Sequence, residues 1–125
     1  MGGNRKKLGK WGEAQAVSYL KKKAYRILDR NVYTPYGELD IIAAVGDPGK
    51  TGIIFVEVKT RTSHIYGFPE QAVDQRKMEH ILGAASHYLQ DHPELGEHWQ
   101  IDVIAVGRYS NRDEPEIYHF ENVVS

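Results

Sequence analysis

The sequence contains no cysteine in 125 residues. Disulfide bonds, thiolate metal sites and a cysteine nucleophile are therefore excluded, and the absence fits a reducing compartment. The chain also lacks an apolar run of membrane-spanning length, and no apolar signal-peptide core follows its basic first residues. We therefore expect a cytoplasmic protein without a membrane partner.

Internal repeats, low-complexity segments and linkers are also missing, so we expect a single domain over residues 1–125. Charge is unevenly divided: residues 1–30 carry a net charge of +7 and the remainder −8, although the whole chain carries only −1. A basic segment beside an acidic body is compatible with a phosphate-binding face next to a cation-binding pocket. From charge alone, a solvated lysine-rich helix is the simpler interpretation.

Hydrophobic periodicity predicts two helices and five strands. The helices are expected over residues 8–24 and from Pro69 to His92, and the strands over 26–33, 38–45, 52–60, 99–106 and 117–120. The strand at 52–60 is apolar on both faces, which is typical of a central strand. This order predicts an α/β fold in which helices flank a mixed central sheet, with an αβββαβ core.

Ionised side chains interrupt the apolar strands at Asp40, Glu57 and Lys59. Burying a charge costs several kcal/mol unless it is paired or binds a metal. Glu57 and Lys59 point to one face of their strand. If Val45 lies opposite Gly52 across the intervening loop, Asp40 falls opposite Glu57 on the same face, a geometry that a slip of one residue would destroy.

Two adjacent carboxylates repel each other unless a positive charge lies between them. Lys59 supplies part of that charge and a divalent cation supplies more; oxygen ligands suit Mg²⁺ or Mn²⁺. Glu13 lies on the apolar face of the first predicted helix, from which a carboxylate can reach the same metal. A cross-strand ion-pair network at Glu57 and Lys59, and a simple boundary glutamate at Glu13, are the alternatives.

Two further groups of polar residues are expected to have structural roles. Asp102 interrupts another apolar strand, and a buried, hydrogen-bonded aspartate is the simpler interpretation. The six histidines show no close metal-ligand spacing, so we expect them at the surface.

Four segments together resemble a known family. They are Gly12–Ala14 (GEA), Gly37–Ala43 (GELDIIA), Phe55–Arg61 (FVEVKTR) and Asp102–Val106 (DVIAV). Asp40 followed by Glu57-Val58-Lys59 is similar to the PD-(D/E)xK nuclease superfamily, and the whole set most resembles its small bacterial YraN-like family. Leu39 stands where the superfamily name has a proline, at a position that varies among its members.

The resemblance implies a restriction-endonuclease-like fold and a nuclease site. Asp40, Glu57 and the backbone carbonyl of Val58 would bind Mg²⁺ or Mn²⁺, Lys59 would be the catalytic lysine, and Glu13 would be an accessory acid. Members of such a fold can lose catalysis and keep nucleic-acid binding.

We therefore expect a metal-dependent endonuclease acting on nucleic acid, on DNA of branched or unusual shape rather than RNA. Basic and polar residues are expected to contact the phosphates: Lys6, Lys7, Lys10, Arg61, Gln71 and Lys77. A homodimer is expected because related junction-cutting enzymes pair two sites. The alternatives are a non-catalytic nucleic-acid-binding module and an accessory protein in which the charged residues are structural.

Overall fold

A computed structural model describes residues 2–46, 52–62, 73–109 and 113–124 of the chain, and the side chains from residue 5 onward. Its elements, in order, are α1 (Gly2–Lys22), β1 (Arg26–Thr34), β2 (Gly37–Val45), β3 (Gly52–Arg61), α2 (Gln75–Asp91), the short 3₁₀ helix η2 (Pro93–Leu95), β4 (Trp99–Gly107) and β5 (Glu116–Phe120). The predicted α/β fold with a mixed sheet between helices is confirmed, and it is consistent with a restriction-endonuclease-like architecture.

The five strands form one sheet in the order β1-β2-β3-β4-β5. Only β3 and β4 are parallel; the other neighbouring strands are antiparallel. Between β3 and β4, α2 carries the chain back across one face of the sheet, so that β4 can run parallel to β3. Parallel neighbours need such a crossover connection. The predicted central position of β3 is therefore confirmed.

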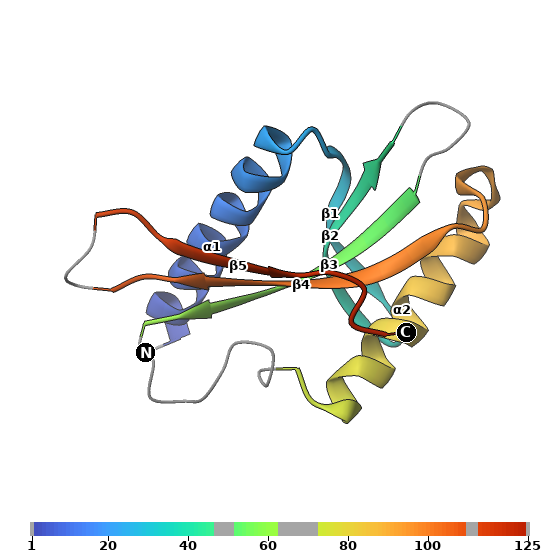
Figure 1. Ribbon diagram of the computed structural model, residues 1–125. Helices are drawn as coiled ribbons and strands as arrows, with labels where there is room; N and C mark the ends of the chain where they lie inside the picture. Colours follow the sequence, from blue (N-terminus) through green and yellow to red (C-terminus); the bar gives the residue numbers. More distant parts are fainter. Residues whose placement is uncertain (1, 47–51, 63–72, 110–112, 125) are drawn as a thin grey trace.

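The two helices cover opposite faces of this sheet (Figure 1). In β3, Ile54 and Val56 pack in a cluster with Leu20 of α1, whereas Phe55 packs in a second cluster with Ile81 of α2. Alternate residues of a strand face opposite sides, so a strand covered on both faces is apolar throughout. Polar residues in such a strand have no access to solvent except near its end.

The predicted register between β2 and β3 is confirmed. Val45 lies opposite Gly52, and the pairing continues without a shift to Ile41 opposite Val56. The next residues along the two strands are Asp40 and Glu57, so the ladder ends where the predicted carboxylates begin.

The helices differ from the prediction at their starts. The first helix begins at Gly2 instead of residue 8, which adds three basic residues, Arg5, Lys6 and Lys7, to α1. The second begins at Gln75, where Asp74 is the N-cap and its Oδ1 accepts a hydrogen bond from the Lys77 N–H over 2.8 Å. Pro69, the predicted start, lies outside the described residues. Within the described part of the chain, no helix is both long and apolar enough to span a membrane.

Candidate metal centre

The Asp40 side chain takes the place of a backbone partner at the point where β2 and β3 stop pairing. Its Oδ2 accepts a hydrogen bond from the Val58 N–H over 2.9 Å. The N–H and C=O of one strand residue point toward the same neighbouring strand. The Val58 carbonyl is therefore directed to the same side of β3 as Asp40, as the predicted ligand set requires.

Asp40 and Glu57 are close enough to affect each other's ionisation. Burial is the largest cause that raises the pKa of Asp40 from 3.8 to about 7, and the charge of Glu57 and a hydrogen bond with it add to the rise. In the absence of a cation, the Asp40 carboxyl therefore takes up a proton near neutral pH. A bound cation would favour the ionised form instead.

The cation next to Glu57 is Lys77. Its Nζ lies 3.3 Å from Glu57 Oε1, and the Glu57 side chain is only 5% exposed. Lys59 was the predicted counter-ion, and Lys77 was predicted to contact phosphate. Both Glu57 and Lys77 belong to the α2 side of the sheet, since Phe55, two residues before Glu57, packs against α2.

Glu13 of α1 reaches the other side of Asp40. Asn31 donates hydrogen bonds from Nδ2 to Glu13 Oε1, over 2.6 Å, and to Glu38 Oε1, over 2.9 Å. Burial is the main cause that raises the pKa of Glu13; the Asn31 hydrogen bond lowers it, and the charges of Asp40 and Glu38 raise it. Carboxylate oxygens of Glu13, Glu38 and Asp40 lie within 4.8 Å of one another.

Asn31 and Glu38 were not singled out from the sequence. Glu38 lies two residues before Asp40, within a segment already recognised, so its position was a usable signal. Asn31 lies in β1 with φ +50°, a left-handed conformation that is rare inside a strand. Asparagine adopts this conformation more often than most residues, but the pattern that predicts the strand does not indicate it.

A cavity of about 320 Å³ opens beside these carboxylates. Its lining comes from α1, β2 and β3: Arg5, Leu8, Gly9, Glu13, Asp40, Val58, Lys59 and Thr60. Three of the predicted site residues, Glu13, Asp40 and Lys59, thus share one cavity with Val58. The N-terminal end of α1 lies beside the end of β3, which explains how residues so far apart in sequence meet (Figure 1).

The donor set of this site fits a divalent cation. The carboxylates that the structure brings together are those of Glu13, Glu38 and Asp40, and carboxylate oxygens are the hard ligands preferred by Mg²⁺ and Mn²⁺. Glu57 adjoins Asp40 but is neither in this group nor among the cavity's lining residues. Burial is the main cause of the raised pKa values of Asp40 and Glu13, and the negative charges of the neighbouring carboxylates add to the rise. A metal ion would offset these negative charges.

The predicted phosphate contacts are placed differently from one another. Lys6, Lys7 and Lys10 are exposed on α1. Arg61 is half-buried at the end of β3, where its carbonyl accepts a hydrogen bond from the Arg108 N–H over 2.7 Å. Gln71 lies outside the described residues.

A second group of polar residues lies at the β4–β5 edge, where ligand atoms of Asp102, His119 and Glu121 are within 4.8 Å of one another. Asp102, which is fully buried, accepts hydrogen bonds from Gln100 Nε2 and the Asn122 N–H, and its Oδ2 lies 2.7 Å from His119 Nε2. The other ring nitrogen of His119 lies 3.1 Å from the Tyr19 hydroxyl. The prediction for Asp102 is confirmed. The prediction that every histidine lies at the surface is wrong for His119, whose side chain is 5% exposed because this network holds it inside.

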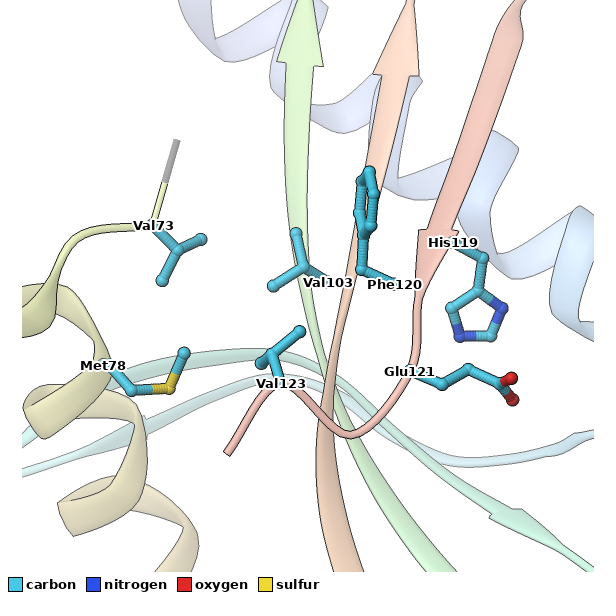
Figure 2. A pocket seen from close by; sticks show the side chains of 7 residues that line it. All are labelled: Val73, Met78, Val103, His119, Phe120, Glu121 and Val123. Carbon is cyan, nitrogen blue, oxygen red and sulfur yellow. The ribbon is translucent and has the colours of Figure 1, made fainter. Parts of the chain in front are cut away.

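The largest cavity that we describe, about 690 Å³, is near this cluster and away from the carboxylates of β2. Figure 2 shows Val73 and Met78 on one side of it and Glu121 with His119 on the other. The remaining lining is apolar: Val103, Phe120 and Val123. Among the described residues, its lining contains one carboxylate, that of Glu121, and no lysine, so we take the smaller cavity as the candidate site.

Comparison with known proteins agrees with these features. The profile described as "Uncharacterised protein family UPF0102" matches residues 12–106, a range that contains Glu13, Asp40, Glu57 and Lys59. The chain belongs to the UPF0102 family. This confirms the YraN-like resemblance noted in the sequence.

Relatives with the same family name are similar over almost their whole length. A UPF0102 protein of Syntrophotalea carbinolica is 46% identical over 116 residues, which cover 93% of this chain and 89% of the relative. One of Syntrophomonas wolfei is 45% identical over 101 residues, 81% of this chain and 84% of the relative. One of Mycobacterium tuberculosis is 41% identical over 121 residues, which cover 95% of this chain and 93% of the relative. The names of these relatives state no activity.

Proposed function

We propose that this UPF0102 protein is a metal-dependent endonuclease that hydrolyses phosphodiester bonds in DNA, with branched or structured DNA as its substrate class. The observation that carries the proposal is the shared cavity of Glu13, Asp40 and Lys59. Clustered carboxylates next to a lysine provide both a cation site and a group that can act on water. Phosphodiester hydrolysis needs both.

Asp40, Glu57 and the Val58 carbonyl hold Mg²⁺ or Mn²⁺, and Glu13 completes the site. When bound, the cation polarises a phosphoryl oxygen and lowers the pKa of a coordinated water. Lys59 orients the attacking water and stabilises negative charge that develops on the phosphate. The Val58 N–H keeps Asp40 aimed into the site through its hydrogen bond.

Binding of DNA relies on its backbone rather than its bases. Contacts to phosphates position a protein without reading sequence, which suits recognition of shape. Lys6, Lys7 and Lys10 offer exposed positive charge along α1. Arg61, Gln71 and Lys77 extend the phosphate contacts, and a homodimer would present two such sites to a branched substrate.

The test is cleavage of fluorescent duplex, flap and four-way-junction DNA with Mg²⁺ or Mn²⁺. Wild-type protein should cut at least one branched substrate, and Asp40→Asn or Lys59→Ala should reduce the rate by at least 100-fold, the scale of a lost acid–base group. Asp113→Asn and Lys22→Ala change the same residue types at exposed positions and should cut normally. No cutting by the wild-type protein, or equal cutting by all four variants, would rule out the proposal.

One observation favours a second candidate, a non-catalytic nucleic-acid-binding module. Lys77 already supplies a positive charge to Glu57, so that carboxylate is neutralised without a metal. This candidate predicts salt-dependent DNA binding that survives Asp40→Asn, with no cleavage by any form of the protein.

A further inference from the structure

Three residues of α1 line the cavity at intervals of four: Arg5, Gly9 and Glu13. Residues four apart lie on one face of a helix. We propose that this face is a subsite for a single DNA strand, in which Arg5 binds a phosphate adjacent to the one being cut. The inference rests on the proposed function, and it narrows the substrate to a strand that is unpaired where it enters the site, as at a flap or branch.

Gly9 leaves the middle of this helix face open. A Cβ placed on Gly9 would have no atom within 4 Å, so packing inside the protein does not require glycine there. The other helix glycines differ: a Cβ on Gly12 would overlap Thr60 Oγ1, and one on Gly83 would lie 3.0 Å from the Tyr36 ring. Glycine inside a helix costs about 1 kcal/mol relative to alanine. Its use at Gly9 is explained if a ligand lies against the helix backbone.

Arg5 places a cation at the far end of the same cavity. In the part of the chain that the structure describes, no carboxylate forms an ion pair with Arg5. The guanidinium group binds phosphate through two parallel hydrogen bonds, which lysine cannot do. An exposed arginine that faces a cavity and has no acidic partner among the described residues is suited to an anionic ligand.

The two ends of the cavity suit a ligand with two linked anionic groups. Eight residues of helix separate the Cα atoms of Arg5 and Glu13 by about 12 Å. That separation leaves room for one phosphate held through the cation at Asp40 and a second phosphate bound by Arg5. Successive phosphates of one strand meet both needs, whereas free phosphate fills one end only.

The size of the cavity favours a single strand. Its volume of about 320 Å³ is at the small end of the range for ligand pockets. That space admits a segment of about one nucleotide, whereas a base-paired duplex is much wider. A strand separated from its complement can enter it.

The subsite is tested by binding of a labelled flap DNA in Mg²⁺, measured by fluorescence anisotropy in the Lys59→Ala background to prevent cutting. Arg5→Ala should weaken binding about tenfold and Arg5→Lys should recover only part of it. Gly9→Leu should also weaken binding about tenfold, although its thermal stability should equal or exceed that of the parent. Lys22→Ala, an equal loss of charge on α1 outside the cavity lining, should change binding no more than about twofold.

A scan of neutral methylphosphonate linkages along the flap identifies the phosphate that Arg5 contacts. A neutral linkage at one position next to the cleavage site should weaken DNA binding by the protein that retains Arg5. The same linkage should not change DNA binding by the Arg5→Ala protein. The subsite would be overturned if no linkage in the scan depended on Arg5, if Arg5→Ala and Lys22→Ala had equal effects, or if flap DNA did not bind.

These outcomes are distinct from failure of the proposed nuclease. If wild-type protein does not cut but the scan depends on Arg5, the strand-binding site stands and the nuclease fails. If it cuts, and Arg5→Ala cuts with unchanged KM, the nuclease stands and the subsite fails.

Discussion

Lys77 Nζ lies 3.3 Å from Glu57 Oε1, so a helix on one face of the sheet supplies the counter-ion of a carboxylate buried in the central strand. Glu57 is 5% exposed and Lys77 is 43% exposed. The pair therefore combines a carboxylate that has lost its water with a lysine that can still reach solvent. This relationship makes Glu57 compatible with two cations, the lysine and a metal ion.

Replacing Lys77 by methionine should destabilise the metal-free protein. The variant keeps an apolar stem and leaves Glu57 buried without its ion pair, which costs 3–5 kcal/mol in fully buried pairs. Because Lys77 is partly exposed, we expect about 1–3 kcal/mol by urea unfolding. Mg²⁺ should restore more stability to Lys77→Met than to wild type, whereas Arg76→Met should show neither effect. Equal responses to Mg²⁺ would argue against metal binding at Glu57.

The raised pKa of Asp40 should make the metal-free protein more stable in mild acid. The folded state holds this proton more tightly than the unfolded state, so the contribution is complete below pH 3.8 and is lost as the pH rises through about 7. From pH 5 to pH 8, the free energy of unfolding should fall by on the order of 2 kcal/mol. Mg²⁺ should reverse most of the fall, since it favours the ionised carboxyl.

Denaturant unfolding at several pH values, with EDTA and with Mg²⁺, checks this dependence. Asp40→Asn should flatten the pH dependence and remove the effect of Mg²⁺. Asp113→Asn, in an exposed turn, should behave as wild type. A pH dependence that persists in Asp40→Asn would assign the effect to other groups.

The sheet and the neighbourhood of Asp40 and Glu57 could be predicted because they depend on local patterns. The apolar alternation and the short loop between β2 and β3 allow one register that buries both strands, and that register was found. Glu13 was likewise placed from helical spacing. Each of these inferences needed only the residues of one or two adjacent elements.

The contacts that were missed depend on tertiary packing or on unusual backbone. The first helix ends with Ala24 at φ 68°, where the Tyr25 N–H bonds the Leu20 carbonyl; this Schellman end normally uses glycine, so the sequence offered no signal. Arg5 joins the cavity only because α1 extends to Gly2 and crosses the end of β3. No periodicity in the sequence reports where one helix crosses a strand.

Asn31 should act as a neutral bridge between two carboxylates. Asn31→Gly keeps the left-handed backbone without strain but removes the donor to Glu13 and Glu38. We expect a loss of about 1–2 kcal/mol at pH 8 in EDTA, which overlaps the values for ordinary hydrogen bonds and the low end of those for hydrogen bonds to charged groups, and partial recovery with Mg²⁺.

The matched control is Asn122→Gly, which changes the same residue type at the same φ of 50° outside the carboxylate cluster. Its stability should not respond to Mg²⁺ differently from wild type. Asn31→Asp adds a further negative charge and should destabilise the metal-free protein more than Asn31→Gly does. If Asn31→Asp is the more stable of the two in EDTA, the carboxylates do not repel one another as described.

Gly12 and Gly9 should respond to alanine with opposite signs, although they lie three residues apart on one helix. A Cβ on Gly12 would overlap Thr60 Oγ1, so Gly12→Ala must push α1 away from β3 and should cost about 1–3 kcal/mol, as overpacking does. Gly9→Ala meets open space and should gain up to about 1 kcal/mol from helix propensity. Thr60→Ala removes the overlapping atom, so the Gly12→Ala, Thr60→Ala double variant should be less destabilised than the sum of the two single changes. Additive losses in urea unfolding would show that the close approach of α1 to β3 does not govern this position.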